Sequence, residues 1–226
     1  MPEINKKKWW FHSLTVDVVI FTISDGNLKV LLIERANKPF FGAHALPGGF
    51  LYKNEQAYNA AKRILKEKAG VSGVYIEQLY TFDKLERDPR GQVISVSYFA
   101  LVPFTKIKIK ESKQTQSPSF YSITKLPKLA FDHKEIIQYA VKRLRSKLEY
   151  TNLAFFLLPE EFSLYQLQRV YEIILGRKLD KRNFQKKFFF LGLISPTKKV
   201  LTGFRQRPAR LYRFKEQKLA ELKKFF

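Results

Sequence analysis

The residues most able to do chemistry lie between residues 49 and 70. Five residues separate Gly49 from Glu55, seven separate Glu55 from Arg63, and Glu67 and Gly70 follow shortly after. Carboxylates suit divalent cations, and guanidinium groups suit anions. These residue types make the run a candidate for binding ions.

This run resembles the Nudix box, whose pattern is Gly-x5-Glu-x7-Arg-Glu-U-x-Glu-Glu-x-Gly-U, where U is a bulky aliphatic residue. The chain matches the pattern at Gly49, Glu55, Arg63, Leu65, Glu67, Gly70 and Val71. The resemblance implies that glutamates on one helix face hold divalent metal ions against a diphosphate. It also implies that water activated by the metal attacks phosphorus.

Two of the three clustered glutamates in the pattern are replaced, by Ile64 and Lys68. Glu67 alone could keep a residual Mg²⁺ but could not clamp the usual two or three ions, and Lys68 repels a cation. We therefore expect no catalytic residues in this degenerate box, no required cofactor, and absent or very slow hydrolysis of diphosphates. Lys68 either replaces the metal's charge and attracts a ligand phosphate or points to solvent from a helix end.

Further side chains could complete a ligand site. Phe40 or Phe41 could stack on an adenine or a sugar, and arginines flank the turn at residues 88–91. Each of these is alternatively a surface charge or a core aromatic residue. Glu55 and Arg63 are expected to form a structural ion pair, and His133 is expected to be structural. The predicted ligand-binding residues are Arg35, Phe41, Gly48, Gly49, Glu67, Lys68, Arg87 and Arg90.

Strands and helices that would position these residues can be read from the first 150 residues. Apolar runs predict strands over 14–23, 28–33, 74–82 and 93–102, with weaker strands within 106–123. The Asp25-Gly26 turn joins the first two strands in a hairpin. One helix is predicted from about Glu55 to Ala69, with Asn54 as the N-cap and Gly70 past its end. Another runs from Asp132 to about Tyr150, with Glu135 in a variant capping box.

This order of elements predicts an α+β fold, an α/β/α sandwich that forms a ligand-sensing domain over residues 1–150. Residues 151–161 have no clean period and are interpreted as a connection. Residues 151–226 are predicted to form a second domain.

The second domain has the pattern of a winged helix. Apolar spacing predicts an amphipathic helix over 162–175, ended by Gly176, and a second helix over 181–191, capped by Asp180. Phe184, Phe188 and Leu191 are expected to pack this second helix on the first. A hairpin of strands 198–204 and 209–214 follows, with a basic tip. Two helices and a hairpin in this order are typical of a winged helix-turn-helix.

The second helix would enter the major groove of DNA, where Arg182 and Gln185 could reach base edges. Arg205 and Arg207 at the tip of the hairpin suit phosphates or the minor groove. The alternative is a basic helical cap packed on the sheet of the first domain. The predicted DNA-binding residues are Lys181, Arg182, Gln185, Lys186, Lys199, Arg205 and Arg207.

Composition supports a polyanionic partner. The chain has 42 Lys and Arg against 20 Asp and Glu, a net charge of +22. Residues 1–150 carry 25 basic and 14 acidic side chains, and residues 151–226 carry 17 and 6, so each part has a net charge of +11. Such a charge attracts nucleic acid, although a lysine-biased composition with solvated charges would look the same.

Other features exclude classes of protein. The absence of Cys rules out disulfides, thiolate nucleophiles and cysteine-ligated zinc. No stretch approaches the ~18 apolar residues that span a bilayer, and the start of the chain lacks the apolar region of a signal peptide. We therefore expect no membrane partner and a cytoplasmic location.

Together these features resemble the Nudix-related transcriptional regulators over Leu14 to Phe214. Matching segments include residues 14–17, 87–91, 131–133, 179–184 and 207–212. The resemblance implies a homodimeric repressor that binds a palindromic operator in double-stranded DNA. Its Nudix domain would sense a small-molecule effector, either ADP-ribose, with NAD-metabolism genes as targets, or a pentose.

Two other functions remain open from the sequence. One is a Nudix pyrophosphatase for ADP-ribose or nucleoside diphosphates with a basic appendage, which would need substitute acids such as Asp83, Glu86 or Asp88. The other is an RNA-binding, decapping-like protein, which shares the charge but needs no winged helix.

Overall fold

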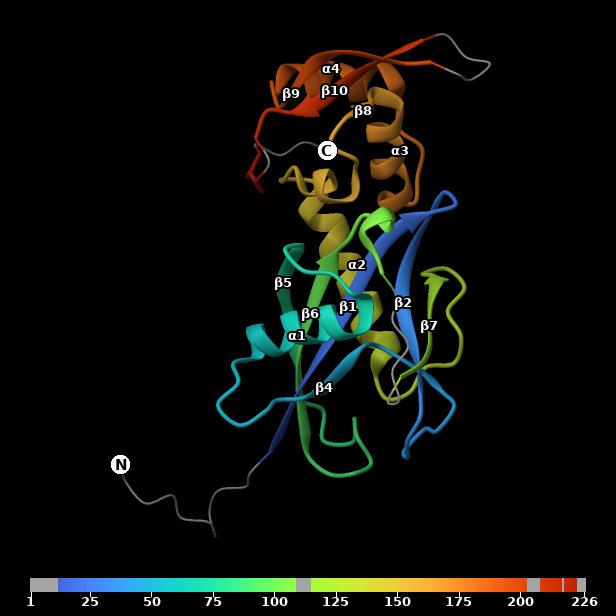
Figure 1. Cartoon of the computed structure of the whole chain (residues 1–226), viewed down its shortest axis with the longest axis vertical. Helices are drawn as coiled ribbons and strands as arrows, with labels where there is room; N and C mark the ends of the chain where they lie inside the picture. Colours follow the sequence, from blue (N-terminus) through green and yellow to red (C-terminus); the bar gives the residue numbers. More distant parts are fainter. Residues whose placement is uncertain (1–11, 109–114, 203–207, 217, 223–226) are drawn as a thin grey trace, which may run out of the picture.

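The computed structural model describes residues 12–108, 115–202, 208–216 and 218–222. Two parts are stacked along the long axis of the molecule (Figure 1). The first part contains β1 (Ser13–Ser24), β2 (Asn27–Arg35), β3 (His44–Ala45), β4 (Gly48–Phe50), α1 (Ala57–Ala69), β5 (Tyr75–Phe82), β6 (Val93–Leu101), η1 (Phe104–Lys106), β7 (Thr115–Ser122) and α2 (His133–Leu148). The second contains η2 (Leu153–Leu157), β8 (Phe162–Ser163), α3 (Leu164–Leu175), α4 (Lys181–Phe190), β9 (Ile194–Leu201) and β10 (Ala209–Phe214).

The first part is the predicted α/β/α sandwich. Its strands are ordered β3-β2-β1-β6-β5, with β4 also paired to β1 and β7 to β2. β1 and β2 form the expected hairpin, and both turn residues, Asp25 and Gly26, have positive φ as a type I′ turn requires. β1 and β6 run parallel. Alternate residues of β1 face the layer that contains α1 and the layer that contains α2. A strand covered on both faces explains the unbroken apolar run.

The beginning of α1 differs from the prediction. The helix starts at Ala57, with Gln56 at the N-cap position and no side-chain cap. Asn54 has φ 63°, so it lies in a left-handed turn before the helix and does not cap it. Glu55 instead accepts hydrogen bonds from the Tyr52 amide and from Arg63. The end is as predicted, because Gly70 takes the left-handed conformation there.

The predicted capping box of α2 is wrong. Asp132 precedes the helix, but its carboxylate makes no cap hydrogen bond because both of its oxygens accept from Arg87. Glu135 pairs with Lys84 instead. α2 also ends at Leu148, two residues before the predicted end.

The second part is the predicted winged helix. Ser163 and Gln166 form a capping box at the start of α3, and Asp180 caps α4 by accepting from the Asn183 amide. Phe184 and Phe188 are buried, as predicted. Residues 162–163 are not helical but form β8, which pairs with β10, and β9 begins at residue 194 rather than 198. Arg205 and Arg207 lie outside the described residues.

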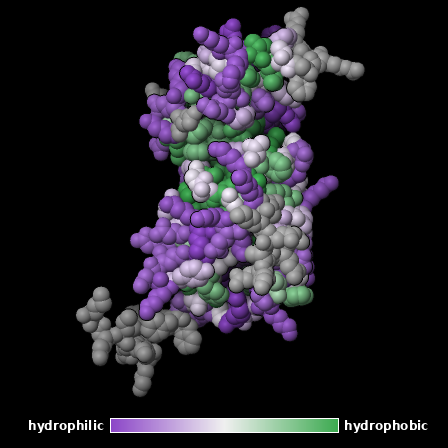
Figure 2. Space-filling model, viewed as in Figure 1, coloured by the Kyte–Doolittle hydropathy of each residue, from purple (hydrophilic) through white to green (hydrophobic). Residues whose placement is uncertain are grey.

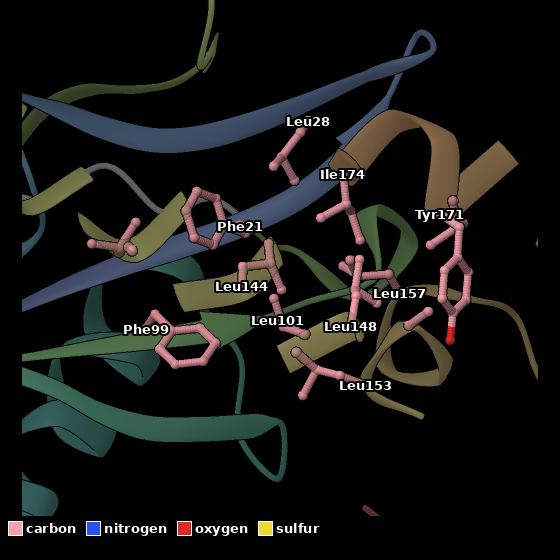
Figure 3. Close-up of a cluster of buried hydrophobic side chains, with 14 of the residues drawn as sticks. Phe21, Leu28, Phe99, Leu101, Leu144, Leu148, Leu153, Leu157, Tyr171 and Ile174 are labelled. Atoms are coloured by element: carbon pink, nitrogen blue, oxygen red, sulfur yellow. The ribbon is translucent and has the colours of Figure 1, made fainter. Parts of the chain in front are cut away.

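The two parts share one hydrophobic core. Figure 3 shows side chains from the sheet, α2, η2 and α3 in a single cluster. η2 lies in the predicted connection, yet its Leu153, Ala154 and Leu157 are buried. Leu144 and Leu148 of α2 are fully buried in the same cluster. Hydrophobic residues also gather on the visible surface where the two parts meet (Figure 2).

Polar contacts reinforce this junction. Arg145 of α2 donates from Nε to the Ile174 carbonyl at the end of α3, at 2.8 Å. Asn152 binds the backbone of Lys218 and Ala220, so the segment after the wing returns to the junction. Across the described part of the chain, we find no helix that combines the length and the apolar character needed to cross a bilayer.

We predict that Leu148→Ala lowers the free energy of unfolding by about 2–5 kcal/mol, because it leaves a cavity in the shared core. Urea denaturation followed by circular dichroism measures the change. Leu85→Ala is the control: Leu85 is 68% exposed, and its truncation should cost less than about 0.5 kcal/mol. Equal effects of the two substitutions would contradict a core shared through α2.

Candidate functional site

A cavity of about 340 Å³ opens beside β4 in the first part. Residues from the sheet, the end of α1, the loop before β6 and the start of α2 line it. Six of the sixteen lining residues are charged: Asp17, Arg35, Lys68, Arg87, Asp88 and Arg90. The cavity thus has four basic groups and two carboxylates, a balance suited to an anionic ligand.

Arg87 forms the fixed base of the cavity. It donates from Nε and Nη2 to the two carboxylate oxygens of Asp132, at 2.9 and 2.8 Å. Its Nη2 also lies 3.5 Å from Asp17 Oδ2. Bidentate pairing in a buried setting holds the guanidinium in one orientation.

Asp17 is a buried carboxylate in the middle of apolar β1. It accepts a 2.6 Å hydrogen bond from Ser95 Oγ, and His133 Nε2 lies 3.6 Å away. His133 Nδ1 accepts from the Leu46 amide, so the imidazole joins α2 to the loop before β4. Burial lowers the pKa of His133, which keeps the ring neutral with its proton on Nε2. His133 is thus structural, as predicted, although it also lines the cavity.

Aromatic rings and arginines form one wall of the cavity. The Arg35 guanidinium lies 4.7 Å from the centre of the Phe131 ring, and Arg90 lies 5.6 Å from the same centre and 5.2 Å from that of Phe50. These are cation–π distances. Phe131 has φ 53°, a strained backbone for an aromatic residue that its surroundings must maintain.

Asp88 and Arg90 neutralise each other in this wall. Arg90 donates to both Asp88 oxygens, at 2.9 and 2.6 Å. Burial alone would raise the pKa of Asp88, but the hydrogen bonds from Arg90 outweigh it and the pKa is lowered. Asp88 is therefore ionised and already bound by a cation.

Gly48 is required by a close approach of two strands. It pairs with Asp17 across β4 and β1. A Cβ at position 48 would overlap Asp17 Oδ1 and lie 2.9 Å from the Val16 carbonyl oxygen. A Cβ at Gly49 would meet nothing within 4 Å. Only the first glycine of this pair is therefore demanded by packing.

The helix of the box does not present a set of metal ligands. Ile64 is buried in the apolar layer between α1 and the sheet, so it faces away from the cavity. Glu67 does not line the cavity; its side chain is 46% exposed and lies 3.7 Å from Arg63. Lys68 does line the cavity, and burial lowers its pKa.

The donor set does not fit magnesium. The two carboxylates that line the cavity, Asp17 and Asp88, are each engaged by an arginine. Neither Asp83 nor Glu86, proposed above as substitute acids, lines it. No group of three or more acidic or histidine side chains able to hold a metal is found in the described ranges.

Glu55 and Arg63 form the predicted ion pair. Arg63 donates from Nε and Nη2 to the two Glu55 oxygens, both at 2.8 Å. These hydrogen bonds lower the pKa of Glu55 to about 2. The pair fastens the loop after β4 to α1, which positions the glycines at the cavity.

Of the eight predicted ligand-binding residues, the structure brings six to one cavity: Arg35, Gly48, Gly49, Lys68, Arg87 and Arg90. Glu67 and Phe41 are not among the lining residues, and Phe41 is 69% exposed. Phe131 provides the aromatic wall instead, and Phe40 packs on its ring at 4.9 Å.

Sequence reasoning did not predict Asp17, Phe50 or Phe131 as ligand-site residues, and it named Asp88 only as a substitute acid for the alternative enzyme function. A signal for Asp17 was available, because a carboxylate inside a strand that is otherwise apolar is seldom placed there without a partner.

The second part presents a basic surface on α4. Lys181, Arg182 and Lys186 are exposed and Gln185 is half-buried, opposite the buried Phe184 and Phe188. Lys199 on β9 is also exposed, but it pairs with Glu161 at 2.9 Å, so its charge is partly compensated. The exposed side of α4 therefore carries the predicted basic residues together.

These features define a Nudix fold joined to a DNA-binding winged helix. The family model described as "NUDIX domain" matches residues 13–140, and that described as "NrtR DNA-binding winged helix domain" matches residues 154–214. The chain is 40% identical over 219 residues to the "ADPR responsive transcriptional repressor NtrR" of Acinetobacter baylyi, covering 95% of this chain and 86% of that protein. The chain therefore belongs to the NrtR family of Nudix-related transcriptional regulators.

Solved structures agree with this assignment. Shewanella oneidensis NrtR complexed with a 27mer DNA matches with a TM-score of 0.79 and 37% identity, covering 89% of this chain and 93% of that one. The NUDIX domain of the same protein complexed with ADP ribose matches with a TM-score of 0.55 and 38% identity, covering 62% and 94%. The first part alone is also 34% identical over 137 residues to an ADP-ribose pyrophosphatase of Methanocaldococcus jannaschii, covering 60% of this chain and 78% of that enzyme.

We predict that Gly48→Ala destabilises the protein by about 1–3 kcal/mol, because the new methyl group forces Asp17 or β4 to move. Chemical denaturation of the purified chain measures the loss. Gly49→Ala makes the same chemical change one residue away, in open space, and should unfold within about 0.5 kcal/mol of the unmodified protein. A Gly48→Ala protein as stable as Gly49→Ala would show that β4 does not lie this close to Asp17.

Proposed function

We propose that this protein is a transcriptional repressor that binds operator DNA through its winged helix and responds to ADP-ribose bound in the Nudix cavity. The observation that carries the proposal is the presence of two features in one chain. One is a cavity lined by four basic groups, and the other is a winged helix whose second helix, α4, is basic on its exposed side. Similarity to an ADPR-responsive repressor and to an ADP-ribose-bound Nudix domain supports the choice of ligand.

Helix α2 connects the cavity to the winged helix. The first residue of α2, His133, lines the cavity, and the residue before it, Asp132, holds Arg87. Near its other end, Leu144 and Leu148 pack with α3, and Arg145 binds the end of α3. A ligand that changes the contacts of Arg87 would therefore act on the helix against which the winged helix packs. The ligand can change the affinity for DNA only if it binds one relative arrangement of the two winged helices of a dimer more tightly than another.

The proposal includes a homodimer and a palindromic operator. A single reading helix covers only one half-site, and a two-fold dimer places two such helices on one face of the duplex about one helical turn, or a multiple of it, apart. We expect the protein to act in the cytoplasm, where a repressor of this kind meets its operator.

The proposal also includes loss of hydrolysis. Ile64 is buried, Lys68 lines the cavity in place of a glutamate, and both carboxylates at the cavity are bound by arginines. We therefore expect ligand binding to need no metal cofactor, and any residual Mg²⁺ at Glu67 to lie outside the cavity. The competing function, an ADP-ribose pyrophosphatase, is the known activity of a relative of the first part.

We predict that ADP-ribose stabilises the protein, because a ligand at a hundredfold its Kd adds about 2.7 kcal/mol to the free energy of unfolding. A thermal-shift panel of ADP-ribose, NAD, arabinose and xylose measures this, followed by release of AMP in magnesium. The proposal expects a shift with ADP-ribose and no AMP. A shift with a pentose alone would indicate a sugar sensor. AMP release that is lost in Glu67→Gln would indicate the enzyme.

We predict that Arg182→Ala relaxes sequence preference, with a loss of about 1–3 kcal/mol on the preferred duplex and little on random DNA. Lys199→Ala should instead weaken both duplexes alike and reduce the salt slope by up to about one, since the Glu161 pair already offsets part of its charge. Fluorescence anisotropy over a range of salt concentrations measures both.

Lys62→Ala on α1 is the control, because it removes one charge from the other part of the molecule. If Arg182→Ala and Lys199→Ala both bind the two duplexes as the unmodified protein does, α4 and the wing are not the DNA-binding surface. Competition between duplex DNA and RNA separates the RNA-binding alternative.

A further inference from the structure

The position that a metal ligand would occupy in this fold carries a lysine whose side chain reaches the cavity. Lys68 lies in the last turn of α1 and lines the same cavity as Gly48 and Gly49. The residue before it, Glu67, is turned outward and lies near Arg63. A positive charge therefore stands where a Nudix enzyme would hold a cation.

The remaining charges of the cavity divide into two groups. Arg87 is bound by Asp132 and lies near Asp17, and Arg90 is bound by Asp88. Arg35 is different, because its guanidinium donates hydrogen bonds to the backbone carbonyls of Pro39 and Asn37 and covers the Phe131 ring. Arg35 and Lys68 come from β2 and α1, so two separate elements direct positive charge at the same space.

Both of these cations are destabilised by their surroundings. Burial lowers the pKa of Lys68, with Glu67 only partly offsetting it. Burial, together with repulsion from Arg90, lowers the pKa of Arg35, and attraction to Asp88 and Asp17 offsets this only in part. A bound anion would relieve this cost, because an opposite charge at short range favours the charged form of each group.

We propose that Lys68 and Arg35 form a metal-independent seat for the diphosphate group of the ligand, in which the Lys68 ammonium supplies the charge that Mg²⁺ supplies in Nudix enzymes. The inference rests on the proposed function, since it names the part of the ligand that each side chain meets. The inference goes beyond the proposed function because it predicts that binding of the diphosphate depends on the charge of Lys68 and not on a metal ion. Without a metal-bound water beside phosphorus, a diphosphate held in this way stays intact.

A simple surface role for Lys68 predicts different behaviour. A solvated lysine at the end of a helix interacts with the helix dipole and contributes only to stability. Lys66, two residues earlier in the same last turn, is exposed and does not line the cavity. The two lysines therefore form a matched pair for substitution.

The test measures binding of ADP-ribose to the full chain by calorimetry, in EDTA and in magnesium. We expect the unmodified protein to bind equally well in both, within about twofold. Lys68→Met keeps the length of the side chain and removes its charge, and it should weaken binding at least tenfold, about 1.4 kcal/mol. Lys66→Met should bind as the unmodified protein does. Loss of binding in EDTA, or unchanged binding by Lys68→Met, would overturn the proposal.

Two further measurements separate this inference from the proposed function. Inorganic pyrophosphate alone should bind in EDTA and lose affinity in Lys68→Met. If it does so while ADP-ribose does not bind, the seat stands and the assigned ligand is wrong. If ADP-ribose binds in EDTA but pyrophosphate fails to compete with it, the ligand stands and the seat is wrong. Lys68→Glu should bind poorly in EDTA, and equal thermal stability of the variants confirms that folding is unaffected.

Discussion

The pairing of Arg87 with Asp132 is the contact on which the arrangement of this molecule depends. It joins a loop between two sheet strands to the start of α2, and the nearby Asp17 extends it into the middle of β1. Because all three side chains are largely buried, removing any one would leave a charge without compensation. The interaction also explains why α2 begins without the cap that its sequence offers. Asp132 is used for tertiary structure rather than for the helix end, and the cavity gains a guanidinium in a fixed orientation.

The core shared by the two parts links the Arg87–Asp132 contact to the winged helix. α2 begins at the cavity and ends among side chains that also pack with α3 and η2. A helix packed along its length moves as a body, since close-packed interiors do not deform continuously. The winged helix is therefore attached to the same helix that holds the cavity's arginine, and the hydrogen bond from Arg145 to Ile174 fixes the end of α3 against it. This is the physical basis on which occupancy of the cavity can bear on DNA binding.

The site keeps the loop and helix of the Nudix box but not its set of acidic side chains. The glycine at residue 48, the Glu55–Arg63 pair and the left-handed Gly70 keep the loop and helix in place. The residues that would gather metal have been replaced by an apolar side chain in the core and by a cation in the cavity. The geometry of this loop and helix is thus maintained by contacts that do not involve residues 64 and 68, where the box pattern has glutamates.

The sequence alone determined the elements whose signals are local. The hairpin at Asp25-Gly26, the glycine that ends α1, the Asp180 cap and the buried face of α4 depend on neighbours within a few residues, so spacing was enough to predict them. The tertiary structure decided which side chains meet in the cavity. Phe131 rather than Phe41 forms its aromatic wall, Glu67 faces away, and Asp17 lies at its base. These outcomes depend on residues far apart in the chain, 45 positions for Arg87 and Asp132 and 78 for Asp17 and Ser95. No local periodicity encodes such contacts, because they exist only once the sheet and both helices have packed.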